Sequence, residues 1–223
     1  MPARIVAFDL YGTLLDYTKL QGIVTEYSPM AEAVVDAWRA RQLQLTNAAT
    51  STGRFVDFDR ITLLALHEIA PRFMLKLASA DQKRLVDAWA QLPLFPDVRG
   101  ALDGLARRRI PCAVITNGVA STARNALVHA GIEGYFSEVY SADAVATFKP
   151  NKRVYDQILA LGVVESEVLF VSSNDWDAMG ARQAGYRTVW VNRRRSSLSP
   201  RPERTISDLS ELSLVLDDDL AAR

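Results

Sequence analysis

The sequence is poor in several residues and patterns that would point to particular classes of protein. A single cysteine, Cys112, excludes an internal disulfide, and its apolar surroundings predict a small buried side chain. Only two histidines are present, His67 and His129, both in segments with helical patterns, so a histidine base has little support. No apolar run approaches membrane-spanning length and no signal-peptide pattern precedes Asp9, which predicts a cytoplasmic protein without membrane contacts.

Charge of either sign is not in excess, because 26 Lys and Arg residues balance 26 Asp and Glu residues. This balance gives no reason to expect nucleic acid or an anionic membrane as a partner. The short basic run at residues 193–195 is predicted to be a solvated loop. The glycines form neither a dinucleotide fingerprint nor a phosphate-binding P-loop. The 223 residues suffice for one large domain, or for a domain with a subdomain.

The most informative stretch lies near the N-terminus. An apolar run at residues 5–8 ends at Asp9, and Gly12 follows closely. The run predicts a buried strand, and the glycine allows a tight turn after it. A carboxylate at the carboxyl end of a buried strand lies where open α/β sheets bind ligands. Aspartate is also common at turns, so a local capping role for Asp9 fits this stretch as well.

The rest of the chain divides into a helical block and an alternation of strands with helices. Helical periodicity runs through residues 26–89, with a break at 50–53, and Pro93 and Pro96 end the block. Beyond it, alternation predicts an α/β fold with a doubly wound parallel sheet. The predicted domains are a core of residues 1–14 and 94–223 and a helical subdomain of residues 15–93. The predicted later strands are 111–115, 135–141, 168–171, 188–191 and an edge near 206, and the predicted helices are 98–109, 121–130, 154–160, 177–184 and one ending near 215, before a frayed acidic tail at 217–219.

Polar side chains stand where these strands end. Each has an ordinary explanation: Thr116 and Ser172 could cap helices, and Lys149 could be a surface lysine. Asn174 could likewise form a turn. In a parallel sheet, however, these strand ends converge on one crevice, so their shared placement predicts a single site. The full set that follows strands or adjoining loops is Asp9, Thr116, Asn117, Lys149, Ser172, Ser173, Asn174 and Asp177.

This set resembles the motifs of the haloacid dehalogenase superfamily, and within it those of the L-2-haloacid dehalogenases. The resemblance covers nearly the whole chain and implies a Rossmann-like core with a helical cap inserted after the first strand. It also implies a homodimer that needs no cofactor and no metal. The matching motifs are Asp9-x-Tyr11-Gly12-Thr13, Thr116-Asn117-Gly118, Lys149-Pro150, Ser172-Ser173-Asn174-x-Trp176-Asp177 and, in the cap, Trp38-Arg39-x-x-Gln42-Leu43.

Two departures separate this chain from the phosphatases that share the resemblance. Those enzymes carry a second aspartate where this chain has Tyr11, and a metal-binding Gly-Asp pair where it has Ser172 and Ser173. Mg²⁺ prefers carboxylate oxygens, so the second change weakens a metal site. A departing halide needs no proton, which agrees with the loss of the acid. A small-metabolite phosphatase and a non-catalytic binding module remain the alternatives at this stage.

The resemblance implies an (S)-2-haloacid dehalogenase that forms an aspartyl ester on Asp9 from a small 2-haloacid. A surface position is the ordinary alternative for Arg39, and core packing is the alternative for the apolar pocket residues. Thr116 replaces a more usual serine, and Ala40 a more usual glutamine. The implied catalytic residues are Asp9, Arg39, Lys149, Asp177, Ser172 and Asn174, and the implied substrate-binding residues are Leu10, Tyr11, Thr13, Leu43, Phe58, Thr116, Asn117, Tyr155 and Trp176.

Overall fold

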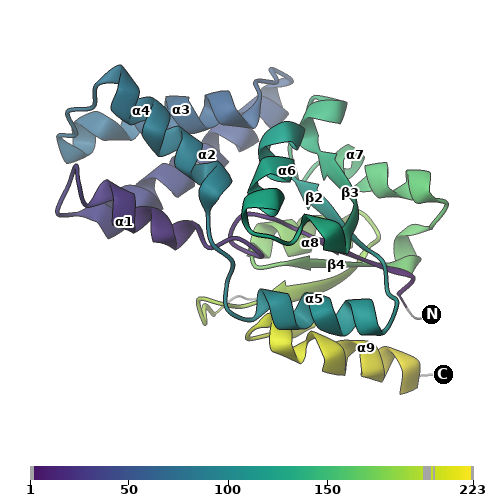
Figure 1. Cartoon of the computed structure of the whole chain (residues 1–223). Helices are drawn as coiled ribbons and strands as arrows, with labels where there is room; N and C mark the ends of the chain where they lie inside the picture. The colour runs from purple at the N-terminus through teal and green to yellow at the C-terminus, as the bar shows by residue number, and fades with distance from the viewer. Residues whose placement is uncertain (1–2, 198–201, 203, 222–223) are drawn as a thin grey trace.

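The protein is built around one parallel β-sheet (Figure 1). Its structure is a computed structural model that describes residues 3–197, 202 and 204–221. The strands are arranged in the order β3-β2-β1-β4-β5-β6, and every neighbouring pair is parallel. This confirms the predicted fold class. The strands are β1 (Ile5–Phe8), β2 (Cys112–Thr116), β3 (Phe136–Ser141), β4 (Val168–Ser172), β5 (Arg187–Val191) and β6 (Thr205–Ile206).

Three adjacent strands, β1, β2 and β4, are buried along their whole length. Their sequences are largely apolar and rich in β-branched residues, as expected for strands covered by helices on both faces. Figure 1 shows α5 (Val98–Arg107) and α9 (Leu212–Ala221) beneath the sheet and α6 (Ala120–His129) above it. The strand order places β1 between β2 and β4, so the carboxyl ends of these three strands adjoin.

The helices between β1 and α5 stand together at one end of the molecule (Figure 1). They are α1 (Gln21–Val24), α2 (Ala31–Thr52), α3 (Phe58–Ile69) and α4 (Ser79–Asp87). Gly53 ends α2 in the left-handed conformation, with φ of 68°, and the Asp57 side chain caps α3 by accepting from the Arg60 N–H at 2.8 Å. The helical block is thus where the sequence predicts it, and the domain boundaries at 14 and 94 stay predictions.

Three local predictions differ from the structure. The single helix expected at 154–160 is a short α7 (Lys152–Tyr155) followed by a 3₁₀-helix, Asp156–Leu161. The acidic tail is helical instead of frayed, because α9 continues to Ala221. The buried Leu212 and Leu216 of α9 pack toward α5, and Asp217 forms an ion pair with Arg108 at 2.6 Å.

The third difference concerns the basic run at 193–195, which is only partly solvated. Arg193 forms an ion pair with Asp97 at 2.9 Å and donates to the Thr13 carbonyl oxygen at 2.8 Å. Its guanidinium lies 4.0 Å from the ring centroid of Phe95. These partners lie far away in sequence, so local charge patterning could not reveal them.

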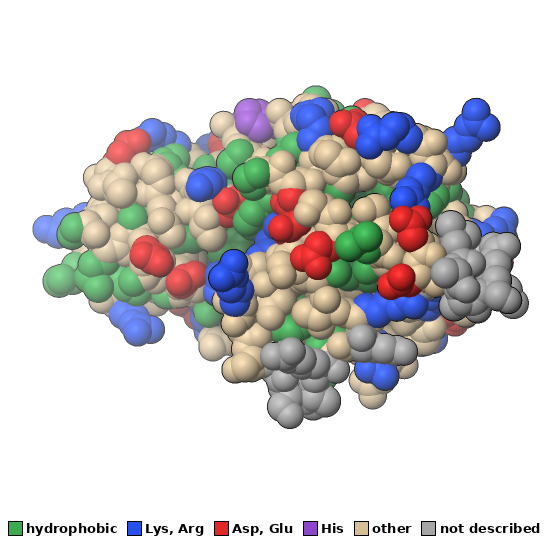
Figure 2. Space-filling view, turned by 90° about the horizontal axis from the view of Figure 1, so that it is seen from below, with side chains coloured by type: hydrophobic (Ala, Val, Ile, Leu, Met, Phe, Trp, Pro, Cys, Tyr) green, Lys and Arg blue, Asp and Glu red, His purple; other side chains and the backbone are tan. Residues whose placement is uncertain are grey.

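The surface agrees with the balanced composition. Acidic and basic side chains are interspersed over the described part of the face in Figure 2. None of the helices that the structure describes is long and apolar enough to cross a membrane. Cys112 is buried as predicted, and burial raises the pKa of its thiol to about 12.

Candidate active site

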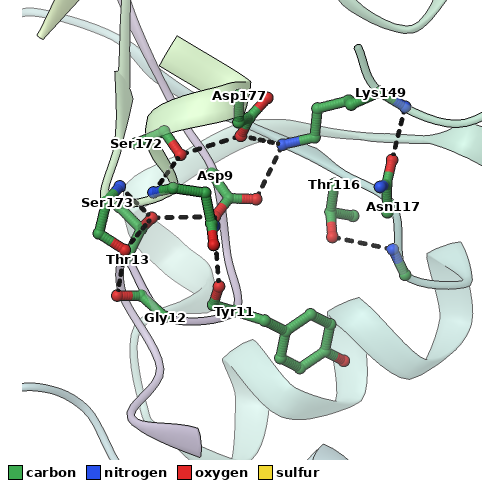
Figure 3. Close-up of polar contacts among 12 residues, drawn as sticks. Asp9, Tyr11, Gly12, Thr13, Thr116, Asn117, Lys149, Ser172, Ser173 and Asp177 are labelled. Carbon is green, nitrogen blue, oxygen red and sulfur yellow. Dashed lines mark hydrogen bonds and ion pairs between the residues drawn. The ribbon is translucent and has the colours of Figure 1, made fainter. Parts of the chain in front are cut away.

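Asp9 is held by three side chains at the carboxyl end of β1 (Figure 3). Its Oδ2 accepts hydrogen bonds from the Thr13 hydroxyl at 2.9 Å and the Asn174 amide at 2.8 Å. Its Oδ1 lies 2.8 Å from the Lys149 ammonium. Each of these contacts is with another side chain, and none is with a helix N-terminus, so the structure does not favour the capping role for Asp9.

The turn after β1 explains why Thr13 reaches back to Asp9. The Leu10 carbonyl oxygen accepts from the N–H groups of Thr13, Leu14 and Leu15, which reverses the chain at once. Gly12 adopts φ of 88°, a conformation that glycine tolerates best. The sequence Asp-Leu-Tyr-Gly-Thr therefore builds the turn and supplies one of the donors to the carboxylate.

Lys149 lies between two carboxylates and is 1% exposed, so the surface alternative is wrong. Its Nζ is 2.8 Å from Asp9 Oδ1 and 2.8 Å from Asp177 Oδ2 (Figure 3). Burial disfavours the ammonium, but the two carboxylates outweigh burial and raise the pKa of Lys149 above its usual value. Asn117 positions this lysine, because its side-chain oxygen accepts from the Lys149 N–H at 2.8 Å.

Asp177 is fully buried on the far side of Lys149. Besides the ammonium, it accepts from the Ser172 hydroxyl at 2.9 Å and the Tyr155 hydroxyl at 2.8 Å. Burial raises the pKa of Asp177 to about 6, and the charge of Asp9 acts in the same direction while Lys149 opposes it. Tyr155, which the resemblance implies as a substrate-binding residue, thus contacts Asp177.

The loop after β4 turns its polar groups toward the loop after β1. The Ser173 N–H donates to the Thr13 hydroxyl oxygen at 2.9 Å, and the Ser173 hydroxyl donates to the Gly12 carbonyl oxygen. Asn174 precedes α8 (Asp175–Gln183), but its amide reaches Asp9 instead of capping that helix. Asp175, for which the sequence gave no role, accepts from the Trp176 N–H at 2.6 Å in the first turn of α8.

Arg39 approaches from α2 and is 7% exposed, so it is not a surface helix arginine. Its guanidinium lies 5.5 Å from the ring centroid of Tyr17 and 5.9 Å from that of Trp89, and it donates to the Gln42 side-chain oxygen at 3.3 Å. Burial lowers the pKa of Arg39, while the charge of Asp9 acts to raise it. The Nε–H has no hydrogen-bond partner in the described structure, which leaves a buried donor beside the site.

Four of the predicted substrate-binding residues line two separate cavities. A cleft of about 660 Å³ is lined by Arg39, Leu43, Asn174 and Trp176. Tyr11 and Phe58, whose rings stack at 6.1 Å, line a separate cavity of about 470 Å³ with Trp89. The other predicted substrate-binding residues are buried and line neither of these cavities; they are Leu10, Thr13, Thr116, Asn117 and Tyr155.

Thr116 is the last residue of β2. Its hydroxyl oxygen accepts from the Gly118 N–H at 3.0 Å, which makes a local turn, and the hydroxyl donates to no acceptor among the described residues. A Cβ on Gly118 would lie 2.9 Å from the Tyr11 ring, so this glycine permits the close approach of the two loops. Ser141 holds the same loop, since its hydroxyl donates to the Gly118 carbonyl oxygen at 2.7 Å.

Sequence reasoning missed the aromatic surroundings of Arg39. Tyr17 lies 22 residues before Arg39 and Trp89 lies 50 residues after it, and no motif marks either of them. Gln42 offers a weak signal, because it is three residues from Arg39 and such side chains adjoin on a helix. Among the described residues, no group of three or more His, Cys, Asp or Glu side chains could hold a metal ion. The position between Asp9 and Asp177 is filled by the Lys149 ammonium.

The comparisons with known proteins agree with these features. The family model for haloacid dehalogenase-like hydrolases matches residues 3–185. The chain belongs to this family. It is 36% identical over 219 residues to (S)-2-haloacid dehalogenase 2 of Pseudomonas sp. (strain CBS-3), with 96% of both chains covered.

Solved structures of dehalogenases also match over nearly the whole chain. The L-2-haloacid dehalogenase RSc1362 has a TM-score of 0.92 at 31% identity, covering 97% of this chain and 100% of that chain. An L-2-haloacid dehalogenase from Xanthobacter autotrophicus, with chloropropionic acid covalently bound, has a TM-score of 0.88 at 26% identity, covering 96% and 98%. The resemblance drawn from the motifs is thereby confirmed for the family.

Replacing Lys149 with methionine should lower the free energy of unfolding at neutral pH by about 3–5 kcal/mol, because two buried carboxylates lose the cation between them. The remaining carboxylates would favour their protonated forms in the folded state. The folded protein then binds more protons than the unfolded chain, so the loss should shrink as the pH falls. Urea unfolding at several pH values measures this.

Lys152→Met is the matched control for that experiment. Lys152 is half exposed and pairs with Asp156 and Glu165 at the surface, so its loss should cost at most about 1 kcal/mol. Equal losses for the two variants, or a Lys149→Met loss that does not change with pH, would contradict the buried ion pairs.

Proposed function

We propose that this hydrolase is an (S)-2-haloacid dehalogenase. It would hydrolyse the carbon–halogen bond of short L-2-haloalkanoic acids, giving 2-hydroxy acids and halide through an ester on Asp9. The observation that carries the proposal is the buried Asp9–Lys149 pair, with Tyr11 in place of a second carboxylate. The dehalogenases among the relatives support it, as does the one with chloropropionic acid covalently bound.

In the first step the Asp9 carboxylate attacks the carbon that bears the halogen. A new carbon–oxygen bond forms as the carbon–halogen bond breaks, and the halogen leaves with the bonding electrons as a halide. An aspartate is ionised at neutral pH, so it needs no activating base. Its weakness as a nucleophile in water comes from hydration, and its nearly complete burial removes most of that hydration.

The substrate carboxylate needs cationic and hydrogen-bonding partners, because it would otherwise repel Asp9. Lys149 and the hydroxyl proton of Thr116 are the proposed partners, together with the backbone N–H groups near Leu10 and Tyr11. The extra methyl group of Thr116, compared with a serine, would narrow this part of the site.

The departing halide is assigned to Arg39 and Asn117. A guanidinium and an amide both present N–H donors to a spherical anion. The unpaired Nε–H of Arg39 favours this role, since a buried donor without a partner gains most from an incoming anion. Leu43 and Trp176 supply apolar walls to the same cleft. Tyr11 and Phe58, whose rings stack on each other in the adjoining cavity, would supply further apolar surface to the site.

In the second step water attacks the carbonyl carbon of the Asp9 ester. Asp177 accepts a proton from that water and returns it to the oxygen of the departing hydroxy acid as the acyl carbon–oxygen bond of the ester breaks; Asp9 is regenerated as a carboxylate and the second proton of the water is released to solvent. Ser172 and Tyr155 orient Asp177 through their hydroxyl groups. Asn174 and Thr13 keep Asp9 in place through the cycle. Lys149 compensates the charge on both carboxylates.

A phosphatase on the same scaffold is the alternative reaction. Its acid would occupy the position of Tyr11, whose pKa is raised by burial and which is therefore a poor proton donor or acceptor near neutral pH. The comparisons favour the dehalogenase, since the relatives named above carry that name. A homodimer without a cofactor completes the proposal and rests on the family resemblance, and the cytoplasmic location stays as predicted from the sequence.

Halide release provides the direct test of function. The wild-type protein should release chloride from L-2-chloropropionate in the presence of EDTA, far faster than from the D enantiomer, and Asp9→Asn should abolish the release. A chloride assay run beside phosphate release from a generic ester with Mg²⁺ measures both reactions. Metal-dependent phosphate release without chloride release would establish the phosphatase instead.

The position of the oxygen label tests the ester on Asp9. After a single turnover in heavy-oxygen water, the label should appear in the Asp9 side chain and not in the product, because water attacks the ester carbonyl. Mass spectrometry of the tryptic peptide covering residues 5–19 locates it, and Asp16 in the same peptide is an internal control that should stay unlabelled. Label found first in the product would mean direct attack by water on the substrate.

The raised pKa of Asp177 predicts how turnover depends on pH. A buried acid with a pKa of about 6 is ionised above that pH and becomes protonated below it, so its action as a base is lost as the pH falls. Ester formation removes the negative charge of Asp9, which contributes to the raised value. The acid limb of kcat should therefore lie below pH 6.

Asp177→Asn should remove this acid limb and lower kcat by about 10²–10⁴. It should also accumulate the ester, which quenched-flow mass measurement detects and which shows that the variant folds and completes the first step. An Asp177→Asn protein with unchanged kcat and an unchanged acid limb would exclude Asp177 as the base.

A further inference from the structure

Three arginines line the cleft that contains Asn174 and Trp176, and they differ in how far they are buried and in how strongly they are paired. Arg39 is buried beside its aromatic rings. Arg193 is committed to its ion pair with Asp97 and its hydrogen bond to the chain. Arg194 also lines the cleft, but its side chain is 64% exposed. It is therefore the arginine that a molecule entering from solvent meets first.

The resting contacts of Arg194 join the loop after β5 to the helical block. Its Nη2 lies 3.4 Å from Asp36 Oδ1 on α2, in a pair whose carboxylate is itself 53% exposed. Its guanidinium also donates to the Tyr17 hydroxyl. An ion pair with both partners half exposed and one long contact is weak, because water screens it. A competing carboxylate can therefore displace Asp36 readily.

The Tyr17 ring connects Arg194 to the interior of the site. The Arg194 guanidinium lies 5.7 Å from the ring centroid and the Arg39 guanidinium lies 5.5 Å from it. All three side chains line the same cleft. An exposed cation thus stands beside a buried one, and a single aromatic ring contacts both.

An anionic substrate fits this arrangement. A guanidinium can donate two parallel hydrogen bonds to a carboxylate, which is more than Asp36 receives from Arg194. Positive charge at the mouth of a cleft also raises the local concentration of anions, and this effect weakens with salt. The net charge of the chain is zero, so attraction of an anion must come from such local placement.

We propose that Arg194 is the outer carboxylate receptor of this site, selecting anionic substrates at the cleft mouth with Asp36 as its resting counter-ion. The inference rests on the proposed function and adds a specificity-determining residue outside the reacting groups. Arg194 captures the substrate carboxylate before it passes to the inner partners. It takes no part in bond making or bond breaking.

Steady-state kinetics with L-2-chloropropionate at two ionic strengths tests this proposal. At an ionic strength on the order of 0.01 M, Arg194→Gln should raise KM about 3- to 10-fold and leave kcat within about twofold of wild type. Near 1 M, where the Debye length is about 3 Å, the difference in KM should nearly disappear. Asp36→Asn should change KM in the opposite direction, because it frees Arg194.

Arg195→Gln is the matched control, since it removes the same charge from the adjacent residue, whose exposed side chain is not among those lining the cleft. It should leave KM within about twofold of wild type at both salt concentrations. The proposal is overturned if Arg194→Gln behaves like Arg195→Gln, if its effect is independent of salt, or if it lowers kcat instead. Absence of chloride release by the wild-type protein would overturn the proposed function, and the inference with it.

Discussion

The site depends on one buried ammonium group placed between two buried carboxylates. Asp9, Lys149 and Asp177 carry a net charge of −1 in a region that water scarcely reaches. Burying any of these charges alone would be costly, so each carboxylate requires the ammonium group and the ammonium group requires the carboxylates. The surrounding hydroxyl and amide donors satisfy the remaining carboxylate oxygens. The order of the strands makes this possible, because β1 lies between β2 and β4 and its end is reached from both sides.

The helical block contributes the second half of the site. Arg39 is carried by α2, contacts the aromatic rings of Tyr17 and Trp89, and lies close enough to Asp9 for the two charges to interact. A buried arginine with an unpaired N–H is poorly satisfied when the site holds no anion. The same feature favours an anionic ligand. The arginine of the helical block and the charged groups at the sheet edge therefore both serve the proposed reaction. The cleft between them opens where the loop after β5 meets α2.

Much of the architecture could be predicted because it depends on short-range patterns. The apolar runs that become β1, β2 and β4 are continuous in the sequence, and Gly53 and Asp57 mark helix ends by their own conformational and capping preferences. The 3₁₀-helix after α7 and the ordered Asp217 were not predicted. Both reflect packing and pairing that the local pattern does not contain.

The sequence by itself determined which strand ends carry polar groups, and the resemblance of those groups indicated the family. It could not decide whether Lys149 and Arg39 lie at the surface, since each is an ordinary residue of its segment. The tertiary structure decided this, because it buries Lys149 between two carboxylates and Arg39 beside aromatic rings, and these partners come from other segments of the chain. It also decided the role of the basic run, binding Arg193 inside and leaving Arg194 at the cleft mouth. The physical reason is that burial and charge pairing depend on distances in space, and only the folded chain defines those.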